Sequence, residues 1–175
     1  MILCICGLNG SGKTTLAKAL AHKTGFVHMD AEDYFFPNND HSYKTSRSRE
    51  EVKNLLFADM TLYQNFIFST VNGNMNEQIN SKYDLVIYLD VPLEIRMDRI
   101  KKRSFDKFGK RMLKGGDMYE TEKSFFDFVS GRTSDHIEGW LNTLACPVLR
   151  LDGTKEINES LCTVIPYIGK LSCLE

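Results

Sequence analysis

Eight consecutive residues near the start of the chain follow the pattern G-x-x-x-x-G-K-[ST], which suits the binding of a polyphosphate. They are Gly7, Leu8, Asn9, Gly10, Ser11, Gly12, Lys13 and Thr14, and Thr15 follows them. Glycines let the backbone curl so that successive N–H groups point at one anion. The lysine can reach the β- and γ-phosphates, and the hydroxyl of Thr14 can bind Mg²⁺. We therefore expect this segment to bind a nucleoside triphosphate.

The segments on either side of this loop must position it. An apolar, strand-like run at residues 2–6 precedes the loop, and an Ala- and Leu-rich segment at 13–23, which is typical of a helix, follows it. Further strand-like runs lie at 26–29, 65–71, 85–89 and 148–151, separated by helix-like segments at 49–63, 93–103, 120–144 and 156–170. This alternation predicts parallel βαβ units in an α/β fold, with helices on both faces of the sheet.

The composition excludes several classes of protein. The 175 residues carry a net charge of −1, so no overall positive field favours nucleic acid or anionic lipid. The 42% hydrophobic and 26% charged residues predict one folded domain over residues 1–175. No apolar run could span a membrane and the start lacks a basic signal region, so we expect a cytoplasmic protein. The five cysteines form no C-x-x-C pair, which argues against a zinc site.

The octapeptide between a strand and a helix resembles the P-loop NTPases, and this resemblance implies a three-layer αβα fold. An N-K-x-D motif and an L-S-G-G-Q signature are absent, which argues against Ras-type GTPases and ABC ATPases. The length leaves no room for the extra helical domain of an AAA+ motor. The chain is similar in outline to the shikimate, gluconate, uridine and nucleoside-monophosphate kinases. That group implies five parallel strands in the order 2-3-1-4-5.

Two acidic residues near the end of the second strand match positions that face the phosphate loop in these kinases. By that resemblance, Asp30 supports Mg²⁺ and Asp33 meets the hydroxyl of the acceptor. The chemistry is reasonable, because a carboxylate can accept the hydroxyl proton and orient the oxygen toward the γ-phosphate. The alternative is that both residues only cap the next helix or turn.

A group of arginines follows the fourth strand, on a helix that leads into a glycine-punctuated basic stretch at 104–118. Arg99 and Arg103 share a helical face with Arg96, which we expect to lie mostly at the surface. In the similar kinases such a helix delivers arginines into a lid, so we expect a lid at about 104–118. Arg99, Arg103 and Arg111 would then clamp the phosphates. The alternative is a solvated basic face paired with acidic neighbours.

The last strand and the turn after it resemble the adenine-binding segment of nucleoside-monophosphate kinases. Asp152 and Gly153 stand where backbone groups of that loop read the edge of the base. A plain turn before the last helix, with Asp152 as its cap, is the alternative.

The third strand departs from the pattern of many P-loop ATPases, because no Asp ends it. Ser69, Asn72 and Gly73 stand there instead, and could border the substrate, so metal support falls to Thr14 and Asp30. We expect His28 to be a core histidine with a satisfied hydrogen bond. The segment 37–49 reads as a polar loop.

Together these features predict a kinase that uses ATP and Mg²⁺ and transfers a phosphoryl group to a small-molecule acceptor. Two alternatives stay open: a regulatory protein that binds ATP with little catalysis, and a kinase acting on a polynucleotide end. Nucleic acid is disfavoured by the charge, and the sequence does not indicate an oligomeric state.

Overall fold

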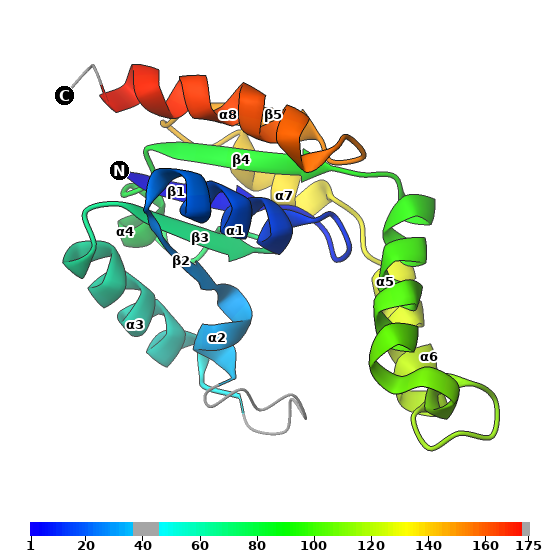
Figure 1. Ribbon diagram of the computed structural model, residues 1–175. Coiled ribbons are helices and arrows are strands. Elements are labelled where there is room, and N and C mark those ends of the chain that lie inside the picture. Colours follow the sequence, from blue (N-terminus) through cyan, green and yellow to red (C-terminus); the bar gives the residue numbers. More distant parts are fainter. Residues whose placement is uncertain (37–45, 173–175) are drawn as a thin grey trace.

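The computed structural model describes residues 1–36 and 46–172. Five parallel strands form its single sheet, in the order β2-β3-β1-β4-β5 (Figure 1). The strands are β1 (Ile2–Cys6), β2 (Val27–Asp30), β3 (Phe66–Thr70), β4 (Leu85–Asp90) and β5 (Val148–Asp152). The predicted α/β class, the five strands and their order are confirmed. Most of the predicted 37–49 loop lies outside the described residues.

Helices cover both faces of this sheet. The described helices are α1 (Lys13–Thr24), α2 (Ala31–Phe35), α3 (Arg49–Leu62), α4 (Glu77–Asn80), α5 (Leu93–Phe108), α6 (Tyr119–Ser130), α7 (Asp135–Leu141) and α8 (Ile157–Ser172). In β1, Leu3 and Ile5 point to the face covered by α1 and α8. Cys4 and Cys6 point to the opposite face, against α3 and α7. Both faces are buried, which explains why the strands are apolar without alternation.

The predicted helix 120–144 is wrong as one element, because α6 and α7 are separate helices. Gly131 ends α6, and the hydroxyl of Thr133 donates a 2.8 Å hydrogen bond to the carboxylate of Asp135 at the start of α7. Such local side-chain bonds compete with a continuing helix. The sequence did not predict α4, and it indicated α2 only as the helix or turn that Asp30 and Asp33 could cap.

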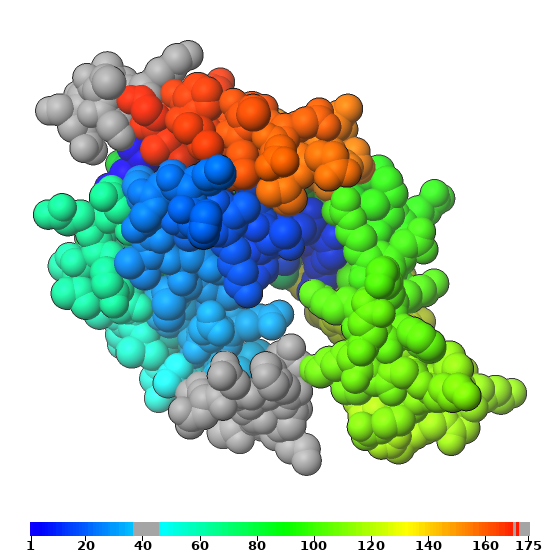
Figure 2. All heavy atoms as spheres, in the orientation of Figure 1, coloured from blue at the N-terminus to red at the C-terminus, as the bar shows by residue number. Residues whose placement is uncertain are grey.

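Helices α5 and α6 form a hairpin that projects from the body of the protein (Figure 1). Helix α5 continues to Phe108 and is followed by the 3-10 turn η2 (Gly109–Met112), so the segment 104–118 begins as helix. Figure 2 shows a hollow between this hairpin and the part of the body that carries α1 and α2. Among the described helices, none is both long and apolar enough to cross a membrane.

The loop after β3 is anchored in the core through Gly73. A Cβ at this position would overlap the ring edge of Trp140 and lie 2.6 Å from the Sγ of Cys4. Trp140 and Cys4 are both buried, so neither can move aside easily. This packing explains why a glycine stands at this position.

We expect Gly73→Ala to destabilise the fold by about 1–3 kcal/mol, because the added methyl group overpacks the core. Urea unfolding followed by circular dichroism measures the change. The matched control is Gly139→Ala in α7, where no atom lies within 4 Å of the added Cβ. That control is expected to be neutral or to stabilise by up to about 1 kcal/mol. Equal effects of the two substitutions would contradict the packing argument.

Candidate functional site

The loop between β1 and α1 has the backbone of an anion cradle. Gly10 and Gly12 adopt φ angles of 82° and 96°, in the left-handed region that favours glycine. At Gly10 a Cβ would also lie 2.6 Å from the carbonyl oxygen of Arg96. Gly12 caps α1 without a side-chain hydrogen bond, so the first N–H groups of this helix have no side-chain cap. A helix start of this kind favours a bound phosphate.

Thr14 and Asp30 come together beside this loop, although they are on different elements. The hydroxyl of Thr14 donates a 2.7 Å hydrogen bond to Oδ2 of Asp30. The same carboxylate oxygen accepts a 2.6 Å hydrogen bond from the hydroxyl of Ser69 at the end of β3. Ser69 in turn lies 2.9 Å from Nε2 of His28. The expected hydrogen bond of His28 is therefore present, and burial lowers the pKa of its imidazole.

Asp30 and Asp33 also form a capping box at the start of α2, as the alternative interpretation predicted. Oδ1 of Asp30 accepts from the N–H of Glu32 at 3.1 Å, and the carboxylate of Asp33 accepts from the N–H of Asp30 at 3.2 Å. The two interpretations are compatible for Asp30, because each of its oxygens has a different partner. Asp33 is exposed and keeps an oxygen outside the capping bond.

A metal ion fits the pair of Thr14 and Asp30 on chemical grounds. Mg²⁺ is usually bound through one or two protein groups, with phosphate and water oxygens as the other ligands. The hydroxyl of Thr14 donates its proton to Asp30, which leaves its lone pairs free for a cation. Among residues 1–36 and 46–172 no group of three or more acidic, His or Cys side chains could hold a metal alone.

Arginines of α5 contact the outer side of the loop. The expectation that Arg96 lies at the surface is wrong: its side chain is buried, with Nε donating to the carbonyl of Val91 at 3.1 Å and Nη1 to that of Asn9 at 3.3 Å. The guanidinium of Arg99 donates to the carbonyls of Gly10 and Ser11 at 3.4 and 3.3 Å. The loop carbonyls of Asn9, Gly10 and Ser11 thus face these arginines.

Arg132, in the turn between α6 and α7, is a site residue that sequence reasoning did not assign. Its Nη1 donates to the side-chain oxygen of Asn9 at 3.0 Å, and its guanidinium lies over the ring of Phe128. Its position after Gly131 marks a helix end, but no sequence signal links it to the loop. Burial lowers its pKa.

The two remaining arginines expected at the site have different surroundings. Arg103 is exposed on α5 and close enough to Lys13 to lower the pKa of that amine. Arg111 lies in the turn between α5 and α6, where its guanidinium forms a two-bond ion pair with Asp117 at 2.9 and 2.5 Å. This ion pair would have to open before Arg111 could meet a phosphate.

The loop is surrounded by positive charge that carboxylates do not balance. Within the described part of the chain, Lys13, Arg96, Arg99 and Arg132 form no ion pair with an acidic side chain. Burial lowers the pKa of Lys13, whereas Asp30 at longer range raises it. Unpaired cations held in a partly buried site are costly. A polyanion seated on the loop would offset this cost.

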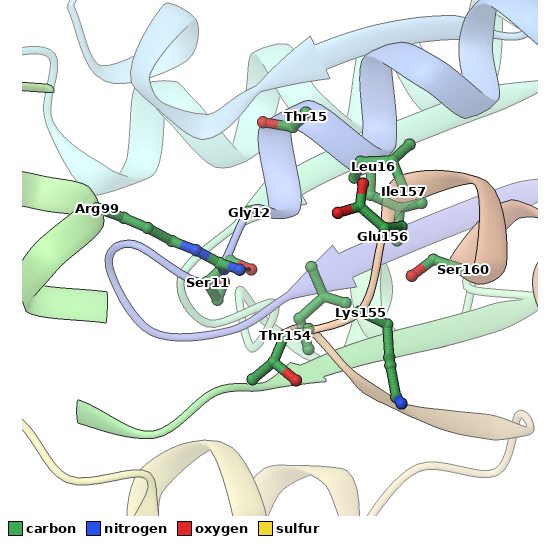
Figure 3. A pocket seen from close by; sticks show the side chains of 12 residues that line it. Ser11, Gly12, Thr15, Leu16, Arg99, Thr154, Lys155, Glu156, Ile157 and Ser160 are labelled. Atoms are coloured by element: carbon green, nitrogen blue, oxygen red, sulfur yellow. Dashed lines mark hydrogen bonds between the residues drawn. The ribbon is translucent and has the colours of Figure 1, made fainter. Parts of the chain in front are cut away.

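A pocket of about 290 Å³ adjoins the loop on the side of α8 (Figure 3). Its walls come from the start of α1, from Arg99 and from the segment after β5. Gly153 is part of the wall, and a Cβ there would lie 2.6 Å from Val91 and 3.1 Å from the carbonyl oxygen of Ser11. Asp152 lies outside the lining, and its carboxylate accepts two hydrogen bonds from Thr154 instead. The turn interpretation therefore accounts for the Asp152 side chain.

Comparison with known proteins places the chain in a family. The family described as an AAA domain matches residues 3–114, which is more than half of the chain. The "Uncharacterized protein YqaC" of Bacillus subtilis is 30% identical over 94% of this chain and 96% of its own length. A Thermococcus kodakarensis protein named "Putative adenylate kinase" is 26% identical, over 96% of this chain and 99% of its own.

The fold is also similar to that of a solved kinase structure. Shikimate kinase from Aquifex aeolicus superposes with a TM-score of 0.55 at 15% sequence identity, covering 99% of each chain. With its P-loop, its strand order and these relatives, the chain belongs to the AAA domain family, within the small-molecule kinase group of the P-loop NTPases.

Proposed function

We propose that the protein is a kinase that transfers the γ-phosphoryl group of ATP, in the presence of Mg²⁺, to a hydroxyl or phosphate of a small metabolite. The observation that carries this proposal is the cluster of cations around a glycine loop. In the described part of the chain, these cations form no ion pair with an acidic side chain. The phosphates of a nucleotide are the polyanion that such a loop binds in P-loop proteins.

The proposed division of roles follows the geometry. Lys13 and the loop amides hold the β- and γ-phosphates, and Arg99 with Arg103 stabilises charge as it develops in transfer. Thr14 and Asp30 would hold Mg²⁺, which supplies charge neutralisation at the phosphates when bound. The pocket beside Gly153 accommodates the base, and the nucleotide extends from there past Gly12 and Thr15 to the phosphate-binding loop.

The acceptor is expected on the opposite side of the loop, in the hollow between the hairpin and α2 (Figure 2). Asp33 stands at the start of α2 and would orient the acceptor oxygen there. The named relatives act on different acceptors: one name specifies an adenylate kinase and the other shikimate. A nucleotide or a hydroxylated small acid is therefore the class to test first.

The hairpin of α5 and α6 is proposed to act as the lid of a single kinase-like unit that spans residues 1–175. It is joined to the loop through Arg99 on α5 and Arg132 after α6, so its movement and the position of the loop are coupled. Closure would exclude water from the phosphates, as lids do in related reactions.

We expect ADP release from MgATP to increase when the correct acceptor pool is added, and Lys13→Ala to abolish this increase while leaving the fold intact. The pools are nucleosides, nucleoside monophosphates, sugars and sugar acids, and shikimate-like polyols. A coupled ADP assay measures the rate, and circular dichroism checks the variant. Retained turnover in the variant would refute the assignment, whereas ATP binding without any response to acceptors would favour a nucleotide switch.

Arg99→Ala is expected to lower turnover by about 10²-fold, because it removes a cation beside the reacting phosphates. The matched control on the same helix is Lys102→Ala, since Lys102 is exposed and paired with Asp106. The control should change turnover by no more than about twofold, as an exposed pair contributes little. Steady-state kinetics at saturating MgATP compares the two, and similar losses would remove Arg99 from the proposed site.

A further inference from the structure

We propose that His28 and Ser69 are positioning residues that hold the Asp30 carboxylate against Thr14. Asp30 would then take the place of the acid that many P-loop ATPases carry at the end of strand three. The inference deepens the proposed function and rests on it, because Thr14 and Asp30 form the metal side of the proposed site. His28 and Ser69 would act only through Asp30 and would touch neither nucleotide nor metal.

The register of the sheet brings these side chains together. Asp30 of β2 and Ser69 of β3 are direct neighbours across two parallel strands. His28 lies two residues before Asp30 on the same strand, so both side chains leave the same face of the sheet. Ser69 is fully buried, and its hydroxyl lies between the imidazole of His28 and the carboxylate of Asp30.

Counting protons fixes the direction of each hydrogen bond. The hydroxyl of Ser69 has one proton, which it donates to Asp30. Its contact with Nε2 of His28 must then be one in which Ser69 accepts and the imidazole donates. The neutral ring must therefore carry its proton on Nε2, with Nδ1 unprotonated. The tautomer of His28 is thus set by a carboxylate that it does not touch.

This arrangement has a consequence for Thr14. Oδ2 of Asp30 receives both hydroxyl protons, at 2.6 Å from Ser69 and 2.7 Å from Thr14, while Oδ1 is held by the start of α2. Both carboxylate oxygens are fixed, so the side chain cannot rotate without losing hydrogen bonds. Thr14 is in turn held with its proton toward Asp30 and its lone pairs free. Partners behind a metal ligand that act in this way commonly affect metal affinity by 10–100-fold.

The first test needs neither nucleotide nor catalysis. Long-range ¹H–¹⁵N correlation spectra of the uniformly ¹⁵N-labelled, nucleotide-free protein report which ring nitrogen of each histidine carries the proton. The His28 signals are assigned by their loss in His28→Gln. We expect a protonated Nε2 and an unprotonated Nδ1. A proton on Nδ1 with Nε2 unprotonated, or an average of the two tautomers, would overturn the proposal.

The second test uses two pairs of substitutions that keep or remove a donor at the same place. Ser69→Thr keeps the hydroxyl and Ser69→Ala removes it. His28→Gln places an amide donor near the former Nε2, whereas His28→Asn is too short to reach Ser69. Calorimetry measures the affinity for ADP with and without Mn²⁺, and the ratio of the two gives the contribution of the metal.

Ser69→Ala and His28→Asn are expected to reduce this metal contribution by about 10-fold, with ADP affinity in the absence of metal unchanged. Ser69→Thr and His28→Gln should retain it within about twofold. A loss of metal-free ADP affinity in Ser69→Ala or His28→Asn would show a merely structural role and overturn the proposal. An equal metal contribution for the two substitutions at each position would also overturn it. If metal-dependent binding behaves as expected but no acceptor is phosphorylated, only the proposed function fails.

Discussion

The site is organised by a concentration of positive charge around one glycine loop. Arg96 and Arg99 donate hydrogen bonds to the loop carbonyls of Asn9, Gly10 and Ser11, and Arg132 donates one to the side-chain oxygen of Asn9. The N-terminus of α1 adds its own positive potential on the inner side. Acidic side chains do not pair with these cations in the described structure. These cations are therefore left for the proposed polyanion.

The sheet supplies the second half of the site by register. Parallel strands end at one edge, so the end of β1 that begins the loop lies beside the end of β3. The end of β2 lies on the far side of β3, and Asp30 reaches Thr14 across it with Ser69 in between. A chain without an acid on β3 can thus place a carboxylate at the loop from one strand further away. In this arrangement the hydroxyl of Ser69 is buried and needs hydrogen-bond partners, and His28 provides one of them.

Much of the fold could be predicted because its signals are local. Apolar runs without alternation indicate buried parallel strands, and the phosphate loop has a specific pattern directly after one of them. The helix 120–144 could not be divided, because its aromatic residues keep a helical spacing across Gly131. The short α2 was hidden by the apolar residues that follow Asp33, where the capping box decides the conformation.

The candidate site likewise has residues that the sequence pattern predicts and residues that it does not. The loop residues are set by pattern, but Arg96 and Arg132 depend on long-range packing that no local rule contains. Arg96 resembles a solvated residue on a charged helix, yet it is buried because α5 leaves β4 directly over the loop. Arg132 lies more than a hundred residues from Asn9 in sequence. The sequence did indicate that Asp30 could cap the next helix, which the structure shows, and its role toward Mg²⁺ belongs to the proposed function.

The central claim, that the unbalanced charge is the binding site of a nucleotide's phosphates, is tested most directly by calorimetric competition. ATP is titrated into the protein with Mg²⁺, alone and in the presence of inorganic tripolyphosphate, and adenosine is titrated separately. The account predicts one ATP site, displacement of ATP by tripolyphosphate, and much weaker binding of adenosine. Absence of ATP binding, or ATP binding that tripolyphosphate does not affect, would contradict it.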